Sequence, residues 1–232
     1  MSLPTLAVPK FSTKLPSTGE DVFFRPFLVK EEKALLLAGE SQDPALFIKA
    51  IKDVISACVE GVDLSKIPYY DVEFLFLNLR AKSAGEEIKY TYRHRNGINR
   101  AGDACETATE VVINIEDIKV QWNEEHVNKF MLDDKYGVIM RHPTIDDVIR
   151  LTGKKFEESE AIARCIESIF DNDTVYPSDN LADTIKFVEQ LLSHQYAKLA
   201  KWFDTMPVLK HTFSYTCGGC GQVDTITYEG VS

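Results

Sequence analysis

The chain has 232 residues, of which 44% are hydrophobic and 27% charged, and this composition is typical of globular proteins. Its 26 Lys and Arg residues against 36 Asp and Glu residues leave a net charge of −10, which argues against nucleic acid as a partner because such affinity comes mainly from neutralising phosphates. No apolar run is long enough to span a membrane, and the opening residues Met1–Pro4 do not begin a signal segment. We therefore expect no membrane partner and a protein that stays in the compartment where it is made.

The five cysteines also argue against secretion. An odd number fits poorly with a closed disulfide framework, which favours a reducing cytoplasm. Cys217 and Cys220 form a close pair near the end of the chain, and the other three are scattered. Of these three, Cys58 and Cys165 lie on apolar faces of predicted helices and are expected to fill the core, whereas Cys105 lies in a predicted loop.

Residues 1–28 predict an N-terminal arm followed by a β-hairpin. The stretch up to Pro16 is rich in Pro, Ser and Thr and has no helical period, and Ser17–Gly19 has the composition of a tight turn. The β-favouring residues that follow are interrupted by Pro26, which restricts that strand to a sheet edge or ends it.

Residues 29–85 predict a helical region. Its second helix is the best marked, since Asp43 suits the N-cap, Pro44 suits the first helical position, and apolar residues then recur at helical spacing. Gly85 is expected to end the last helix. The three helices are expected over residues 29–38, 44–61 and 68–85.

Residues 86–142 predict a central antiparallel β-meander. Segments rich in β-branched and aromatic residues alternate here with polar loops, one of which contains Asn96–Gly97 and Cys105. The four expected strands lie at residues 88–92, 110–115, 127–132 and 136–140.

Residues 143–207 predict a second helical region. Thr144, followed three residues later by Asp147, has the pattern of a capping box and opens its first helix. The polar residues 171–173 are expected to join two helices. The two longer helices of this region are expected over residues 156–169 and 181–205.

Residues 208–232 predict a closing β-hairpin, with strands at 210–216 and 222–228 around a Cys-x-x-Cys-Gly turn. The whole chain therefore predicts an α+β fold of one or two compact domains. Its parts in order are the N-terminal hairpin and helices, the central antiparallel β-meander, the C-terminal helical region and a terminal β-hairpin that resembles a zinc knuckle.

Catalytic signatures are absent from the sequence. It contains no phosphate-binding glycine loop, no zinc-protease helix motif and no nucleophile elbow. Asp133–Asp134 and Asp146–Asp147 resemble acid/base pairs, but surface and capping roles are more frequent for such neighbours. His142 and His194 are assigned ordinary, partly exposed roles. We expect no enzymatic activity, and a hydrolase that uses carboxylate pairs is the minor alternative.

The Cys217–Cys220 pair carries the clearest chemical information in the sequence. A Cys-x-x-Cys turn followed by Gly221 allows both sulfurs to reach one tetrahedral zinc ion, which needs four ligands in a structural site. Cys105 and a histidine, His94 or His211, are the candidates to complete the site within the chain, and Cys58 or Cys165 are less favoured because they lie on apolar helix faces. Two other interpretations stay open: a partner or symmetry mate supplies the missing ligands, or the turn holds no metal.

A second function class follows from the same cysteines. Arg93–Arg95 and Arg100 form the only local basic cluster. Together with the cysteine pair they define an alternative, a zinc-ribbon protein that binds nucleic acid or acts as a transcription adaptor. The net charge of −10 disfavours this alternative, which predicts steeply salt-dependent binding to DNA or RNA.

Two segments resemble one known family. Residues 15–19 (LPSTG) with residues 24–33 (FRPFLVKEEK) look like the N-terminal signature of the T4-type bacteriophage baseplate proteins, which include hub subunits and hub-assembly factors of contractile-tailed phages. Residues 213–221 (FSYTCGGCG) resemble the ending of that family.

The resemblance implies a non-enzymatic phage protein that builds the baseplate hub as a subunit or as an assembly chaperone. It implies other hub proteins as partners, with self-association as a further expectation. The host cell cytoplasm during assembly and the tail baseplate of the virion are the expected locations. Its N-terminal signature makes Phe24, Arg25, Pro26 and Phe27 candidate partner-binding residues.

Overall fold

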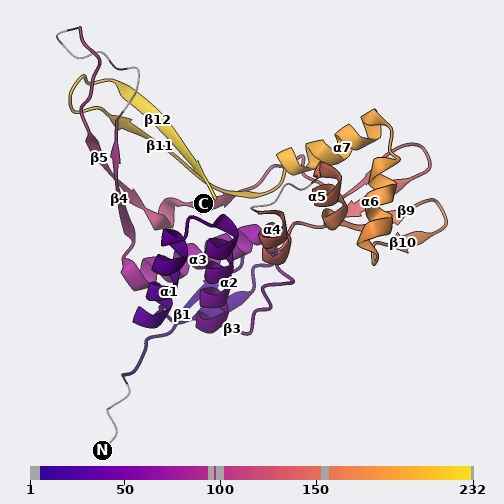
Figure 1. Cartoon of the computed structure of the whole chain (residues 1–232), viewed down its shortest axis with the longest axis horizontal. Helices are drawn as coiled ribbons and strands as arrows, with labels where there is room; N and C mark the ends of the chain where they lie inside the picture. Colours follow the sequence, from indigo (N-terminus) through magenta and orange to yellow (C-terminus); the bar gives the residue numbers. More distant parts are fainter. Residues whose placement is uncertain (1–5, 94–96, 98–101, 153–156, 231–232) are drawn as a thin grey trace, which may run out of the picture.

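The computed structural model describes residues 6–93, 97, 102–152 and 157–230. Figure 1 shows an N-terminal lobe, a C-terminal lobe to its right and a long arm of strands that projects away from both. The described residues form seven α-helices and twelve strands, and all the strand pairs are antiparallel. The α+β fold class is therefore confirmed. No helix of the described part has the length and apolar character needed to cross a membrane.

The N-terminal lobe begins with the predicted β-hairpin. β1 (Phe11–Lys14) pairs with β2 (Asp21–Phe24), and the turn between them includes Gly19, whose φ of +73° favours glycine. β3 (Val59–Glu60) adds a short third strand beside β2. This pairing extends the backbone directly after the second helix, which therefore ends earlier than residue 61, where the sequence places its end.

Three helices cover this sheet, as the sequence predicts. The Asp43 carboxylate accepts hydrogen bonds from the backbone N–H groups of Ala45 and Leu46, and Pro44 occupies the first helical position. The third helix ends at Gly85, whose φ is +100°. The apolar faces of the helices and the hairpin form one core. The helices are α1 (Val29–Glu40), α2 (Pro44–Cys58) and α3 (Tyr69–Ala84).

The predicted central meander is wrong as a single sheet. The strands of residues 86–142 exist, but they belong to three different sheets. β4 (Glu87–Tyr92) and β5 (Thr109–Asn114) pair with each other, and β6 (Lys119–Gln121) pairs with a strand from the end of the chain. β7 (Lys129–Met131) and β8 (Gly137–Met140) belong to the C-terminal lobe. Alternating residues identify strands, but they carry no information about which strand is the partner.

The C-terminal lobe is a four-stranded sheet covered by helices, and two expectations for it are wrong. The chain turns from helix to strand at Ile166, so residues 166–170 form β9 rather than the end of a helix. Residues 171–173 form the turn of the β9–β10 hairpin, in which the Asp171 carboxylate accepts the N–H groups of Asp173 and Thr174. The elements are α5 (Glu158–Cys165), β9 (Ile166–Phe170) and β10 (Val175–Pro177).

The expected long helix after residue 181 is also interrupted. α6 (Leu181–Glu189) ends before Leu192, and α7 (Ser193–Asp204) begins after it. The Leu192 N–H donates to the Gln195 side chain at 2.8 Å, which caps the second helix instead of continuing the first. The break lets both helices contribute to the same core, which includes Val188 and Leu199.

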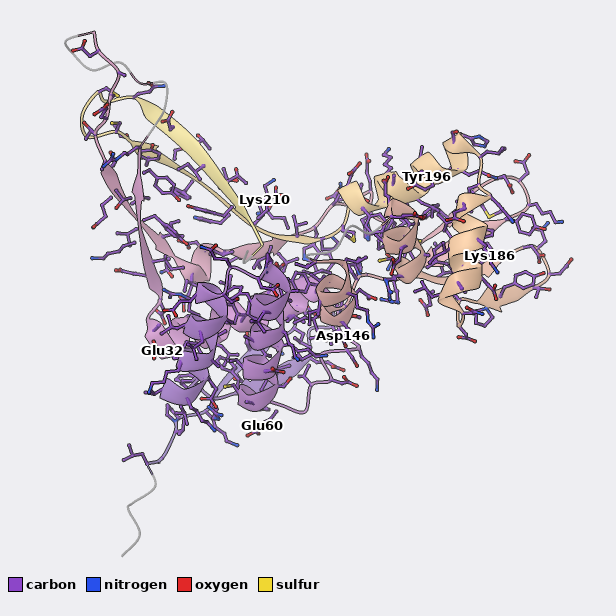
Figure 2. The ribbon with its side chains drawn as sticks, in the orientation of Figure 1. Glu32, Glu60, Asp146, Lys186, Tyr196 and Lys210 are labelled. Carbon is purple, nitrogen blue, oxygen red and sulfur yellow. The ribbon has the colours of Figure 1, made fainter. Side chains whose placement is uncertain are left out.

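The arm contains two ribbons of strands. β11 (Val208–Thr216) and β12 (Val223–Glu229) form the predicted terminal hairpin, and β6 pairs with the base of β11. Figure 2 labels Lys210 at this base, where its ammonium lies 2.7 Å from the Glu229 carboxylate. Figure 1 shows the β4–β5 ribbon and this hairpin converging toward the far end of the arm.

Candidate functional site

Three cysteines meet at the far end of the arm. Cys217 follows β11, Cys220 lies in the hairpin turn, and Cys105 comes from the loop between β4 and β5. The Sγ atoms of Cys105 and Cys217 are 3.7 Å apart, and all three sulfurs lie within 4.8 Å of one another. Three thiols in this arrangement could bind a metal ion.

The hairpin turn has the backbone geometry that the Cys-x-x-Cys-Gly pattern predicts. The Cys217 N–H donates to the Gln222 carbonyl at 2.8 Å, and the Gly221 N–H donates to the Cys217 carbonyl at 2.9 Å. Gly221 has a φ of +75°, a conformation that side chains with a Cβ rarely adopt. The Gly219 N–H lies 3.4 Å from the Cys217 sulfur, so the turn directs a backbone donor at the thiol.

Gly219 also permits the close approach of the two ribbons. A Cβ at this position would collide with the Thr107 side chain and would lie 3.2 Å from the Cys105 sulfur. The N–H of the neighbouring Gly218 donates a hydrogen bond of 3.2 Å to the Thr109 hydroxyl of β5. The turn of one ribbon therefore packs against the loop of the other around the sulfur cluster.

The electrostatics of the cluster favour a thiolate at Cys217. Backbone N–H groups at Cys220 and Gly219 lower the pKa of its thiol to about 6. The Gln222 N–H lowers the pKa of Cys220, but burial and the neighbouring thiols of Cys217 and Cys105 raise it above its ordinary value. One thiol of the cluster is therefore mainly ionised near neutral pH, in the state that binds metals.

The other sequence candidates for this site lie elsewhere or outside the described residues. His94 is not among the described residues, and neither are Arg95 and Arg100 of the basic cluster. His211 lies six residues before Cys217 on β11, about 20 Å along the strand, where its ring stacks on Phe213.

The two cysteines that the sequence assigns to the core are buried there. Cys58 lies in the core of the N-terminal lobe and Cys165 in that of the C-terminal lobe, and each is 2% exposed. Burial raises the pKa of both thiols, to about 12 for Cys165, which keeps them protonated. Both cysteines therefore fill the hydrophobic core, as the helical pattern of the sequence predicts.

The candidate partner-binding segment makes internal contacts. Phe24 is 2% exposed and its ring belongs to the N-terminal core. The Arg25 guanidinium lies 3.1 Å from the Glu31 carboxylate and donates to the Ala57 carbonyl. Pro26 and Phe27 are half-buried. Partner binding through these four residues stays a prediction, and the folded lobe covers the Phe24 ring.

The adjacent carboxylates have structural partners. Asp133 accepts the N–H groups of Lys135 and Tyr136 in a turn, and Asp146 is paired with Lys52. Figure 2 shows Asp146 on α4 (Ile145–Leu151), between the helices of the two lobes. Asp147 closes the predicted capping box. These are the surface and capping roles that the sequence favours.

A pair of histidines lies between the lobes, and one of them is His142, for which the sequence predicts an ordinary, partly exposed role. The Nε2 atoms of His126 and His142 are 2.9 Å apart, and both rings lie against Trp202 of α7. Tyr70 of α3 meets His142 edge to face. Burial lowers the pKa of His126, and it lowers that of His142 to about 4. No spacing pattern connects these residues, because tertiary packing alone brings them together.

Comparison with known proteins identifies one family. The family model described as T4 bacteriophage base plate protein matches residues 8–232, which is nearly the whole chain. Neither the curated proteins nor the solved structures include a match to this chain. The match agrees with the family resemblance of both ends of the sequence. The chain therefore belongs to the T4 bacteriophage base plate protein family.

Proposed function

We propose that this baseplate protein is a non-enzymatic hub component, which acts as a hub subunit or as a chaperone of hub assembly. The observation that carries the proposal is the family match over residues 8–232. The arm supports a role in protein contacts, because β12 is the outer strand of its sheet and leaves one row of backbone groups open to a partner strand.

The proposed partners are other baseplate hub proteins, met first in the host cell cytoplasm. A subunit then remains in the tail baseplate of the virion, whereas a chaperone leaves before the particle is complete. Self-association belongs to the same proposal and would appear as a concentration-dependent mass in sedimentation.

The test is a phage whose gene for this protein carries a stop codon, grown with and without a plasmid copy. We expect hub particles to be missing from infected cells without the plasmid and to return with it. Normal hubs without the protein would refute the proposal. Mass spectrometry of purified virions then separates the two roles, because only a subunit is present at a fixed ratio to other baseplate proteins.

We also propose that the three arm cysteines bind Zn²⁺. In a tetrahedral site with Zn–S bonds of about 2.3 Å, two sulfurs lie about 3.8 Å apart. The Cys105 and Cys217 sulfurs are 3.7 Å apart. The low pKa of Cys217 supports the same metal, because zinc binds thiolates and must otherwise displace protons.

Zinc binding is tested on protein purified without added metal, by elemental analysis. We expect about one zinc per chain, lost in Cys217→Ser and retained in the control Cys58→Ala, which alters a buried cysteine of the N-terminal core. Protein without zinc that also fails to take up added Zn²⁺ would refute this part of the proposal.

A further inference from the structure

The two ribbons of the arm are separate sheets. β4 and β5 pair with each other along six residues each, and β11 and β12 pair along seven. Among the described residues, the strand pairing places no strand of one ribbon beside a strand of the other. Because an isolated two-stranded ribbon is marginally stable in water, side chains must hold the β4–β5 ribbon in place.

Aromatic side chains join the two ribbons from near the base of the hairpin, at Tyr228, to the end of β4, at Tyr92. Tyr90 stacks on Tyr228 and Tyr92 stacks on Tyr215, each with ring centroids 5.5 Å apart. Aromatic pairs of this kind add only modestly to the stability that comes from their buried area. Among the described residues, side-chain contacts and not strand pairing therefore join the ribbons up to Tyr215, two residues before Cys217.

The base of the arm is joined to the N-terminal lobe. Ile115, which directly follows β5, packs with Leu209 of β11 and Leu77 of α3 in a small core. The ends of the ribbons farthest from this core are those that carry the cysteines. A cross-link at that end therefore restricts the movement of one ribbon relative to the other most strongly.

We infer that the metal bound by Cys105, Cys217 and Cys220 is a clasp that fixes the β4–β5 ribbon to the β11–β12 hairpin. The inference rests on the proposed zinc binding and adds that the bound metal joins the two ribbons of the arm. Cys217 and Cys220 belong to one turn, so a metal held by these two alone would join nothing. Cys105 belongs to the other ribbon, 112 residues away in sequence from Cys217, and makes the site a cross-link.

The surroundings of the sulfurs fit a permanent clasp. Cys105 and Cys217 are 6% and 2% exposed, and Cys220 is half-buried. The collision that a Cβ at Gly219 would cause shows that the loop and the turn are in contact. The Cys105 N–H is itself bound to the Gly97 carbonyl at 2.7 Å, which positions the ligand within its own loop.

The test compares hydrogen exchange in the full-length zinc-bound protein before and after chelation with EDTA. We expect amides of β4 and β5 to exchange at least about tenfold faster once the metal is removed, and those of α2 to keep their rates. Cys105→Ser should show the fast exchange without chelator. Thr109→Ala is the matched control, because it removes the 3.2 Å hydrogen bond to Gly218 and leaves all three thiols.

Cobalt provides a second, spectroscopic readout. The sulfur-to-cobalt absorption of the Co²⁺ form scales with the number of thiolate ligands, so Cys105→Ser should lose about one third of it. Cys105→His, which restores a ligand, should restore slow exchange of β4 and β5 in the zinc form. This rescue also separates a lost ligand from a loop that fails to fold.

The outcomes distinguish the clasp from the zinc proposal. Zinc that binds and leaves with no change in the exchange of β4 and β5 would overturn the clasp and leave zinc binding intact. A Cys105→Ser protein with undiminished cobalt absorption would overturn it as well. Protein that takes up neither Zn²⁺ nor Co²⁺ would overturn both.

Discussion

Single residues connect segments that lie far apart in the chain. Asp71 of α3 is fully buried, and its carboxylate accepts hydrogen bonds from the backbone N–H and the hydroxyl of Ser17 in the β1–β2 turn. Burial raises the pKa of Asp71, while the two Ser17 donors oppose the shift. The turn of the N-terminal hairpin is therefore tied to the centre of the helical layer through one polar side chain.

Ser17→Ala should lower the free energy of unfolding by about 1–3 kcal/mol, because it leaves a buried carboxylate short of a donor. Urea denaturation followed by circular dichroism measures the change. The control is Ser12→Ala, which alters an exposed serine of β1 and should be nearly neutral. Equal stability of the two variants would show that the hydroxyl of Ser17 contributes nothing.

At the level of elements, the start of α4 follows its sequence signal closely. In α4 the Thr144 hydroxyl accepts the Asp147 N–H, and the Asp147 carboxylate accepts the Thr144 N–H at 3.0 Å, which confirms the predicted capping box. Burial raises the pKa of Asp147, but the Arg141 guanidinium at 2.7 Å and the Thr144 N–H outweigh it and hold the pKa below its usual value. The same carboxylate thus caps α4 and anchors the chain that enters it from β8.

Thr144→Ala should destabilise the protein by about 1 kcal/mol, because an N-cap hydroxyl of α4 is lost. Thermal unfolding monitored by circular dichroism tests this expectation. Thr152→Ala, at the other end of the same helix, serves as the control, since no N-cap bond is removed there. A larger loss at Thr152 than at Thr144 would contradict the capping role.

At the scale of the whole molecule, the two lobes meet at the His126–His142 pair. The pair lies between Tyr70 of the N-terminal lobe and Trp202 of the C-terminal lobe. With their Nε2 atoms 2.9 Å apart, the two rings can share one proton, but two charged rings would repel. Burial therefore keeps neutral the histidines at this contact between the lobes.

This junction should make the protein acid-sensitive. The pKa of His142 is about 4 in the folded protein and near 6.5 in an unfolded chain, so the unfolded state binds more protons between these values. Stability should fall as the pH is lowered from 6.5 to 4, by up to about 1.4 kcal/mol per pH unit from this residue. Chemical denaturation at pH 7 and pH 5 measures the loss.

His142→Gln should reduce the dependence of stability on pH in this window, because the side chain no longer titrates. His194→Gln is the comparison, since His194 lies exposed at the start of α7. If the His142 variant kept the full pH dependence of the unaltered chain, the junction would not be its source.

The local signals of the sequence were sufficient for much of the fold. Asp43–Pro44, Gly85 and the Thr144 capping box mark helix ends because capping depends on neighbouring residues alone. The two family-like ends of the chain likewise indicated the baseplate family, and the Cys-x-x-Cys-Gly pattern predicted the hairpin turn. These features depend on residues only a few positions apart in the chain, so a sequence pattern is enough to recognise them.

Tertiary structure decided which segments meet. The strands of residues 86–142 were dispersed over three sheets, and Ile166–Phe170 became a strand because β8 offered it a partner. Cys105 joined Cys217 across 112 residues, and two unrelated histidines met between the lobes. The sequence by itself determined the family, the fold class and the cysteine turn. The sequence also named Cys105 as a candidate third thiol, among several. Only packing, which acts between residues distant in the chain, selected Cys105 from these candidates and formed the two separate ribbons.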